Sequence, residues 1–220
     1  MSTIAIISAK PFDQAKQRLA PVLQLGYRRT LVEAMFADAA LAVRRSQMID
    51  QAFVVTADPV AARIAGGQDM TVIDDTADNH SAAAQLGIGR ALTVGARRVL
   101  LIAGDCPLVA TAELDELLAR PVPERSVLIV PDRHGEGTNA LVLTPPDVIS
   151  PAFGEGSRRR HSELAVQAAA EPEVVAVPSL ALDIDTPEDL DELVAQLSVT
   201  FGRAAHTRGM LSQLTRTRPR

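Results

Sequence analysis

Residues 98–108 read RVLLIAGDCPL, a strand pattern followed at once by a turn. Its first six residues form the most strand-like run in the chain, which stops abruptly at Gly104. A short apolar run bounded by turn residues is typical of a buried strand. Ligands of open α/β sheets bind beyond the carboxyl ends of such strands, so Asp105 is a candidate functional residue. The alternative is an aspartate that only shapes the turn before Pro107.

Strand and helix patterns alternate on both sides of this run. The βαβα order predicts a mostly parallel, doubly wound sheet with helices on both faces. After residue 130 a strand follows a strand with no helix between them, which predicts a mixed sheet. Strands or extended runs are expected at 3–8, 51–56, 70–73, 98–103, 126–130, 138–143, 174–177 and 180–185, and helices at 27–45, 59–65, 81–95, 111–119, 158–169 and 187–197.

Composition and charge restrict the class of protein. The 220 residues are 47% hydrophobic and carry a formal net charge of −5. Non-specific nucleic-acid binding needs clustered cations, and base stacking needs aromatic side chains, of which there are one Tyr, five Phe and no Trp. No apolar run approaches the roughly 20 residues of a membrane span. We therefore expect a protein that binds neither nucleic acid nor membranes.

The end of the chain differs from the rest, because residues 201–220 contain five arginines and no acid. We predict a domain over 1–198 and a basic C-terminal extension over 199–220. The extension is either frayed or a helix docked on a partner subunit, as in a homodimer. The single cysteine, Cys106, permits no internal disulfide, and no basic signal region precedes the first strand, so we expect a cytoplasmic protein.

Two aspartates in the sequence Asp183-Ile184-Asp185 form a candidate metal site. Side chains at i and i+2 of a strand point the same way, so both carboxylates would lie on one side. Together with Asp105 they offer the oxygen ligands that Mg²⁺ prefers. The alternative is that Asp185 only precedes a helix capped by Thr186.

Three cations, Lys10, Lys16 and Arg18, follow the first predicted strand. In an acidic chain they form a local positive site suited to a triphosphate or to departing pyrophosphate, although a solvated basic helix face is the alternative. Neither the P-loop nor the dinucleotide-binding glycine pattern occurs after a strand, which argues against ATPase and dinucleotide-binding functions.

Two glycine-containing loops, residues 135–139 (GEGTN) and 154–161 (GEGSRRRH), are candidates for a second anion pocket. Glycines let backbone amides approach an anion, although each loop alone is also an ordinary turn with a helix cap. His134 and His161 have no carboxylate partner at a recognisable spacing, so we predict structural or exposed histidines. Cys106 stands beside a carboxylate, which raises a thiol pKa, so we predict a packed, inert thiol.

Taken in order, five blocks of the sequence resemble the 2-phospho-L-lactate guanylyltransferase family. That family includes the bacterial phosphoenolpyruvate guanylyltransferases, the CofC and FbiD types, which build the side chain of coenzyme F-420. The blocks are Lys10 with 15–21, 101–108, 132–141, 153–161 and 183–187. One segment departs from the pattern: residues 78–83 read DNHSAA where the family often has Gly-Leu-Asn-x-Ala.

The resemblance implies a single-domain nucleotidyltransferase fold and transfer of GMP from GTP to a phosphorylated three-carbon acid, with release of pyrophosphate. The acid is phosphoenolpyruvate, 2-phospho-L-lactate or 3-phospho-D-glycerate, and a downstream transferase consumes the product. The rivals are another nucleotidyltransferase, an Asp-x-Asp glycosyltransferase and a catalytically silent nucleotide-binding module. The resemblance assigns Mg²⁺ binding to Asp105, Asp183 and Asp185, acceptor contacts to Thr138, Gly154 and Ser157, and the basic motif to Lys10, Lys16 and Arg18.

Overall fold

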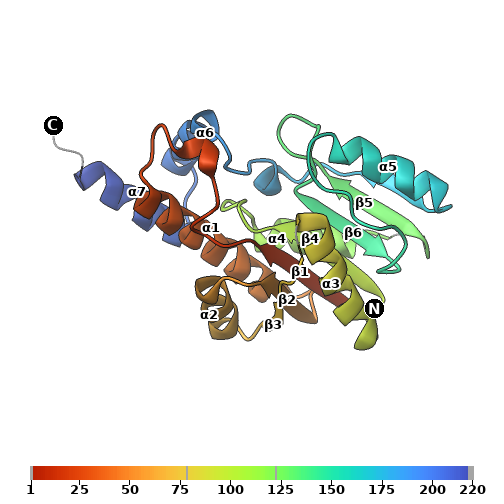
Figure 1. Cartoon of the computed structure of the whole chain (residues 1–220). Coiled ribbons are helices and arrows are strands. Elements are labelled where there is room, and N and C mark those ends of the chain that lie inside the picture. Colours follow the sequence, from red (N-terminus) through yellow and green to blue (C-terminus); the bar gives the residue numbers. More distant parts are fainter. Residues whose placement is uncertain (1, 78, 122, 218–220) are drawn as a thin grey trace.

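The computed structural model describes residues 2–77, 79–121 and 123–217. Asp78, at the start of the divergent segment, and residues 218–220 of the basic end lie outside the described residues. One mixed sheet runs through the molecule in the strand order β3-β2-β1-β4-β6-β5-β7 (Figure 1). Its strands are β1 (Thr3–Ala9), β2 (Gln51–Thr56), β3 (Thr71–Asp74), β4 (Arg98–Ala103), β5 (Ser126–Val130), β6 (Ala140–Thr144) and β7 (Glu171–Val174).

Strand β6 runs antiparallel to its neighbours β4 and β5, whereas the other neighbouring strands pair in parallel. The start of β6 therefore lies at the same edge of the sheet as the ends of β1 and β4. The fold prediction, a single α/β domain with a mostly parallel mixed sheet, is confirmed.

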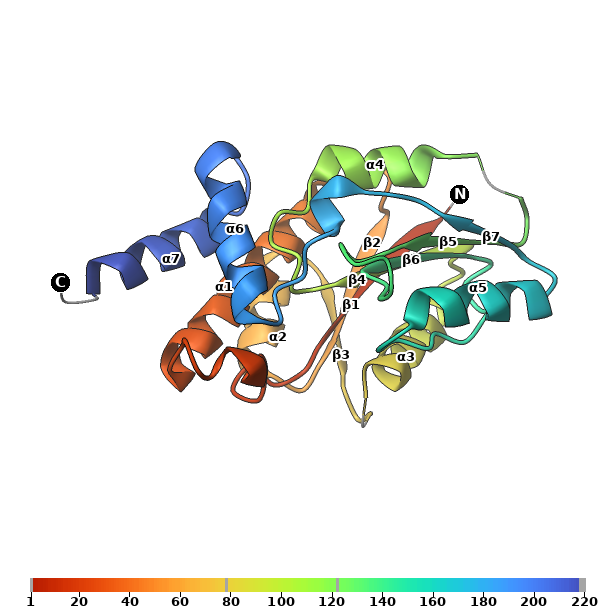
Figure 2. The same ribbon diagram turned by 90° about the horizontal axis from the view of Figure 1, so that it is seen from above.

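Helices cover both faces of the sheet (Figure 2). Alternate residues of β1 pack into two hydrophobic clusters on opposite faces of the sheet. Ala5 and Ile7 belong to the cluster under α1, and Ile4 and Ile6 belong to the cluster under α3 and α5. The helices are α1 (Leu25–Arg45), α2 (Pro59–Gly67), α3 (His80–Thr93), α4 (Thr111–Ala119), α5 (Ser157–Gln167), α6 (Pro187–Val199) and α7 (Ala205–Thr217), with short 3-10 turns at Gln17–Leu19 and Pro178–Leu180.

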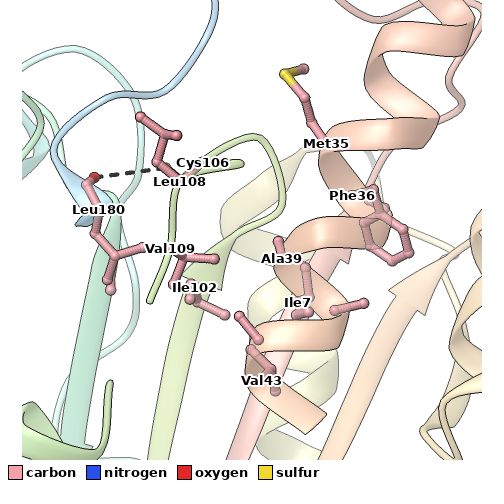
Figure 3. Close-up of a cluster of buried hydrophobic side chains, with 14 of the residues drawn as sticks. Ile7, Met35, Phe36, Ala39, Val43, Ile102, Cys106, Leu108, Val109 and Leu180 are labelled. Atoms are coloured by element: carbon pink, nitrogen blue, oxygen red, sulfur yellow. Dashed lines mark hydrogen bonds between the residues drawn. The ribbon is translucent and has the colours of Figure 1, made fainter. Parts of the chain in front are cut away.

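Each face is packed closely around the central strands. On one face, Phe36, Ala39 and Val43 of α1 lie over Ile7 and Ile102 (Figure 3). On the other face, α3 approaches β1 through Gly87, where an added Cβ would lie 2.5 Å from the Ile6 side chain. No helix among the described residues is long and apolar enough to cross a membrane.

The prediction of an extended run at 180–185 is wrong. Residues 178–180 form a 3-10 turn, and 181–186 are a loop that carries Asp183 and Asp185. The physical reason is a side chain: the buried Asn139 amide donates hydrogen bonds to the carbonyls of Leu180 and Ala181, in place of a neighbouring strand. The last strand lies earlier than expected, at residues 171–174.

The basic end of the chain forms α7, which packs against α1 of the same chain (Figure 1). The carboxylate of Asp38 in α1 accepts hydrogen bonds from the backbone amides of His206 and Thr207, and Met210 is buried. The segment therefore forms a helix docked on its own chain, rather than a frayed end or a helix that only a partner subunit could bind. The domain division at residue 198 and the homodimer stay predictions.

Candidate functional site

A cleft of about 820 Å³ opens at the edge of the sheet where β1 and β4 end and β6 begins. The N-terminus of α3, the loop before β6 and the loop at 153–154 complete its walls. Seven of the nine predicted site residues line it, and they come from five separate segments of the chain. These seven are Lys10, Lys16, Asp105, Thr138, Gly154, Asp183 and Asp185.

Lys16 connects the carboxylates of this cleft. Its ammonium group donates a short hydrogen bond to Asp105 and lies 2.6 Å from Oδ1 of Asp185. Burial alone would lower the pKa of Lys16, but the two carboxylates outweigh it and raise that pKa. Burial alone would likewise raise the pKa of Asp105, yet the Lys16 charge holds it below the ordinary value. Both groups are therefore charged at neutral pH.

Asp183 lies beside this pair. Burial, together with the charges of Asp105 and Asp185, raises its pKa to about 6. Asn139, the residue after Thr138, donates a hydrogen bond to Oδ1 of Asp183 over 3.2 Å. Three carboxylates thus line one cleft, and the Lys16 ammonium pairs with only two of them, an arrangement that calls for further positive charge.

The backbone around Asp185 is fixed by the start of α6. Oδ2 of Asp189 accepts hydrogen bonds from the backbone amides of Asp185 and Thr186, and the Thr186 hydroxyl caps the helix in return. Arg133, from the loop before β6, pairs with Asp189 over 2.5 Å. Asp185 is therefore held by a capping box as well as by Lys16.

Lys10 is held by another loop. Its ammonium nitrogen lies 2.8 Å from Oδ2 of Asp75 and 2.8 Å from the carbonyl oxygen of Ala77. The side chain remains one-quarter exposed, so it can still meet a ligand anion. Arg18, by contrast, is exposed in the 3-10 turn after Lys16 and does not line the cleft. Its role stays a prediction.

Thr138 and Gly154 stand at another wall of the cleft, with Ser157 buried behind them. The Ser157 hydroxyl lies 3.1 Å from Oγ1 of Thr138. Arg160 of α5 donates to the carbonyls of Ala152, Phe153 and Glu155, which fixes the loop around Gly154. Gly154 has a φ of 106°, a conformation that glycine adopts without strain.

The divergent segment at 78–83 meets the cleft at the start of α3. Asn79 caps that helix through the backbone amide of Ala82, so its side chain has a structural use. His80 lines the cleft 3.3 Å from the Ser8 hydroxyl, and burial lowers its pKa. Ser81 accepts a hydrogen bond from the backbone of Phe153 and so joins this helix to the Gly154 loop.

His134 lies exposed in the loop before β6, as predicted. Cys106 is buried beneath the cleft, where its thiol faces the carbonyl of Leu180 over 3.7 Å (Figure 3). Burial and the nearby Asp105 charge raise its pKa well above the ordinary value. The prediction of a packed thiol is confirmed, and its lack of reactivity stays a prediction.

The donor set at the cleft fits a hard divalent cation. Mg²⁺ is commonly bound by one or two carboxylates together with substrate phosphates, and Asp105, Asp183 and Asp185 supply such carboxylates. Among the described residues, no three His, Cys, Asp or Glu side chains converge on one metal position. The Lys16 ammonium lies between two of the carboxylates instead, at the place where a cation is needed.

Two further residues position predicted site residues. Asn139 was predicted as part of the candidate anion loop at 135–139, but its hydrogen bond to Asp183 was not. Asp75 was not predicted at all. No local sequence pattern indicates the role of Asp75, because its partner Lys10 lies 65 residues away in the sequence.

Comparison with known proteins decides the family. Residues 3–217 match the family model described as "Guanylyl transferase CofC like". The chain belongs to this family. It is therefore a guanylyltransferase, and its predicted activity class is confirmed.

Curated relatives in this CofC-like family share much of the sequence. The phosphoenolpyruvate guanylyltransferase of Conexibacter woesei is 50% identical over 222 residues, covering 100% of both chains. The phosphoenolpyruvate guanylyltransferase of Sphaerobacter thermophilus is 36% identical over 90% of this chain and 96% of its own.

Solved structures share the fold with less sequence identity. A structure from Desulfovibrio desulfuricans G20, described as a nucleotide-diphospho-sugar transferase, superposes with a TM-score of 0.75 at 16% identity, covering 97% of this chain and 95% of its own. A Methanothermobacter nucleotidyl transferase gives a TM-score of 0.64 at 18% identity, covering 90% and 99%. The nucleotidyltransferase-like fold is therefore confirmed.

Proposed function

We propose that this protein transfers GMP from GTP to phosphoenolpyruvate and releases pyrophosphate. Two kinds of observation support the acceptor and the donor. Relatives at 50% and 36% identity are named phosphoenolpyruvate guanylyltransferases. In addition, the cleft gathers cations and carboxylates at one wall and a glycine and hydroxyl pocket at another, which suits two phosphorylated substrates that must meet.

The observation that carries the proposal is the Lys16 contact with both Asp105 and Asp185 inside the cleft shared with Thr138. Charges of both signs, fixed in one cleft at the edge of the sheet, are what a reaction between two anions requires. Repulsion between the substrates must be cancelled, and their phosphates must be held in line.

The proposed chemistry balances without a protein nucleophile. An oxygen of the acceptor phosphate attacks the α-phosphorus of GTP and forms a P–O–P anhydride. The bond from the α-phosphorus to the bridging oxygen breaks, and pyrophosphate leaves with that oxygen and the electron pair. The attacking oxygen is already an anion at neutral pH, so no general base is needed.

In this proposal Lys10 and Lys16 bind triphosphate oxygens and stabilise the pyrophosphate as it leaves, and Arg18 adds positive charge at the mouth of the cleft. Thr138 and Gly154 contact the acid and orient its phosphate, and the buried Ser157 contributes to this binding through its hydrogen bond to Thr138. Asp105, Asp183 and Asp185 would hold Mg²⁺, which supplies charge neutralisation on the triphosphate when bound.

Pyrophosphate release tests the proposal directly. Wild-type protein is incubated with Mg²⁺, with GTP or CTP, and with phosphoenolpyruvate, 2-phospho-L-lactate or 3-phospho-D-glycerate. Because the products are labile anhydrides, the assay is coupled to a downstream transferase. Fastest release with GTP and phosphoenolpyruvate is expected; a preference for CTP or for another acid contradicts the proposed substrates.

A matched pair of variants tests the carboxylates. Asp105→Asn removes one charge at the cleft and should lower kcat by roughly a hundredfold or more, as expected when an electrostatic contact to the reacting groups is lost. Asp147→Asn makes the same change at an exposed position outside the cleft and should leave kcat unchanged. Equal activity of the two variants would remove the carboxylate role.

The pathway and the cellular location belong to the same proposal. The product would enter coenzyme F-420 synthesis through the downstream transferase, and the reaction would take place in the cytoplasm. These points, like the homodimer, rest on the resemblance and on composition.

A further inference from the structure

His161 is fully buried in α5 and uses both of its ring nitrogens. Nε2 lies 2.9 Å from the backbone nitrogen of Ala152, and Nδ1 lies 3.1 Å from Oγ1 of Thr138. The Phe153 ring packs edge-on against the imidazole, with the ring centroids 5.3 Å apart. This histidine therefore joins α5, the Gly154 loop and the wall of the cleft.

These contacts define the tautomer. A backbone N–H can only donate, so the amide of Ala152 requires a lone pair on Nε2 of His161. Burial, and then the nearby charge of Arg160, lower the pKa of His161 to about 4. The ring is thus neutral at pH 7, and its one hydrogen is on Nδ1. That hydrogen is donated to the Thr138 hydroxyl oxygen.

The donated hydrogen decides what Thr138 offers to the cleft. The Ser157 hydroxyl donates its hydrogen to Oγ1 of Thr138. Oγ1 of Thr138 thus accepts from both Ser157 and Nδ1 of His161, and the hydrogen of the Thr138 hydroxyl itself remains free to be donated. The described part of the chain gives Thr138 no other hydrogen-bond partner. Ser157 is 1% exposed and does not line the cleft, whereas Thr138 does.

We infer that His161 is a positioning residue that fixes the Thr138 hydroxyl as a hydrogen-bond donor toward the anionic acceptor acid. The inference rests on the proposed function, in which Thr138 binds that acid. With the hydrogen on Nε2 instead, Thr138 would have to donate to Nδ1 of His161 and would turn a lone pair toward a carboxylate or phosphate oxygen. His161 thus favours the binding of an anion by orienting the Thr138 hydroxyl, without contacting the anion itself.

Two substitutions separate the nitrogens of His161. The side-chain amide nitrogen of Asn stands near the place of Nδ1, so His161→Asn keeps a donor for Thr138 and removes the acceptor for Ala152. The longer His161→Gln reaches the place of Nε2, so it keeps the acceptor for Ala152 and removes the donor for Thr138. Thr138→Val removes the hydroxyl itself, and His161→Gln/Thr138→Val closes a double-mutant cycle.

The experiment is calorimetric binding of phosphoenolpyruvate to the full-length wild type and these four variants, with thermal unfolding measured for each. We expect Thr138→Val and His161→Gln each to weaken binding by about tenfold, the size of a lost hydrogen bond to an anion. The double variant should bind no more than about twofold more weakly than Thr138→Val, because one contact is lost only once. His161→Asn should bind within about threefold of wild type even if its Tm falls.

Independent effects would overturn the inference: a double variant weakened by about a hundredfold means that His161 does not act through Thr138. The inference is also overturned if the affinities follow Tm across the set, because that is the pattern of a merely structural residue. It is overturned likewise if the wild type does not bind phosphoenolpyruvate. Failure of the proposed function gives another result, namely the expected binding pattern in a wild type that releases no pyrophosphate from GTP.

Discussion

Lys16 and Asp185 lie 169 residues apart in the sequence, yet the ammonium nitrogen of Lys16 is 2.6 Å from Oδ1 of Asp185. The same nitrogen contacts Asp105, and Lys16 has a left-handed backbone with a φ of 55°. The cation therefore lies between two carboxylates that we propose as Mg²⁺ ligands. A divalent ion held by both would displace it and would free Lys16 to bind phosphate oxygens.

Lys16→Met should increase the stabilisation that Mg²⁺ gives to the nucleotide-free protein. Without the ammonium group the clustered carboxylates repel one another, so an added cation stabilises the folded state more. A gain of about 1 kcal/mol corresponds to a rise in Tm of roughly 3 °C for a domain of this size. Lys10→Met is the control, because Lys10 pairs with Asp75 outside the cluster. Equal Mg²⁺ shifts in both variants would contradict displacement of Lys16.

Asp38→Ala should detach the N-terminus of α7 and leave the chemistry intact. The Asp38 carboxylate is buried and accepts hydrogen bonds from the amides of His206 and Thr207, so its loss should lower the free energy of unfolding by about 1–2 kcal/mol. Urea denaturation measures this loss, with Glu33→Gln as the control, a change on the same helix that removes only an ion pair with Arg63 over 3.7 Å. An unchanged midpoint in Asp38→Ala would contradict the anchoring of α7 by Asp38, and a raised KM would show that α7 has another role.

His161 should make the protein sensitive to acid. Its pKa is depressed to about 4 in the folded protein, so between pH 6.5 and 4 the unfolded chain binds the extra proton and stability falls as the pH falls. The positive charge of Arg160 also lowers the pKa of His161 and so acts in the same direction. Wild type should lose roughly 2–3 kcal/mol more than His161→Asn between pH 7 and 4. Parallel stability curves for the two proteins would refute this.

Most of the fold could be predicted from local pattern. Strands such as 98–103 and 51–56 agree residue for residue, because buried strands carry unbroken apolar runs and end at turn residues. The loop at 181–186 could not, because its carbonyls are satisfied by the Asn139 amide, a tertiary contact with no local signature. The docking of α7 likewise depends on Asp38, far away in the sequence.

The site was predictable where residues follow strand ends. Asp105 and Lys10 fall at the same edge because parallel strands end together, and Thr138 joins them because β6 is antiparallel. Pairing within the cleft was not predictable, since Lys16 was assigned to phosphate alone and meets two carboxylates instead. The hydrogen bonds of His161 could not be predicted from the sequence either, because its partners are a backbone amide and a hydroxyl rather than a carboxylate.

Guanylyl transfer to phosphoenolpyruvate is tested most directly by ³¹P NMR recorded during the reaction of the protein with GTP, Mg²⁺ and phosphoenolpyruvate. We expect two mutually coupled phosphoanhydride resonances from the joined α-phosphorus and acceptor phosphorus, together with pyrophosphate, and a much slower appearance of these products with Asp105→Asn. GDP and inorganic phosphate as the only products, with the phosphoenolpyruvate signal unchanged, would contradict it.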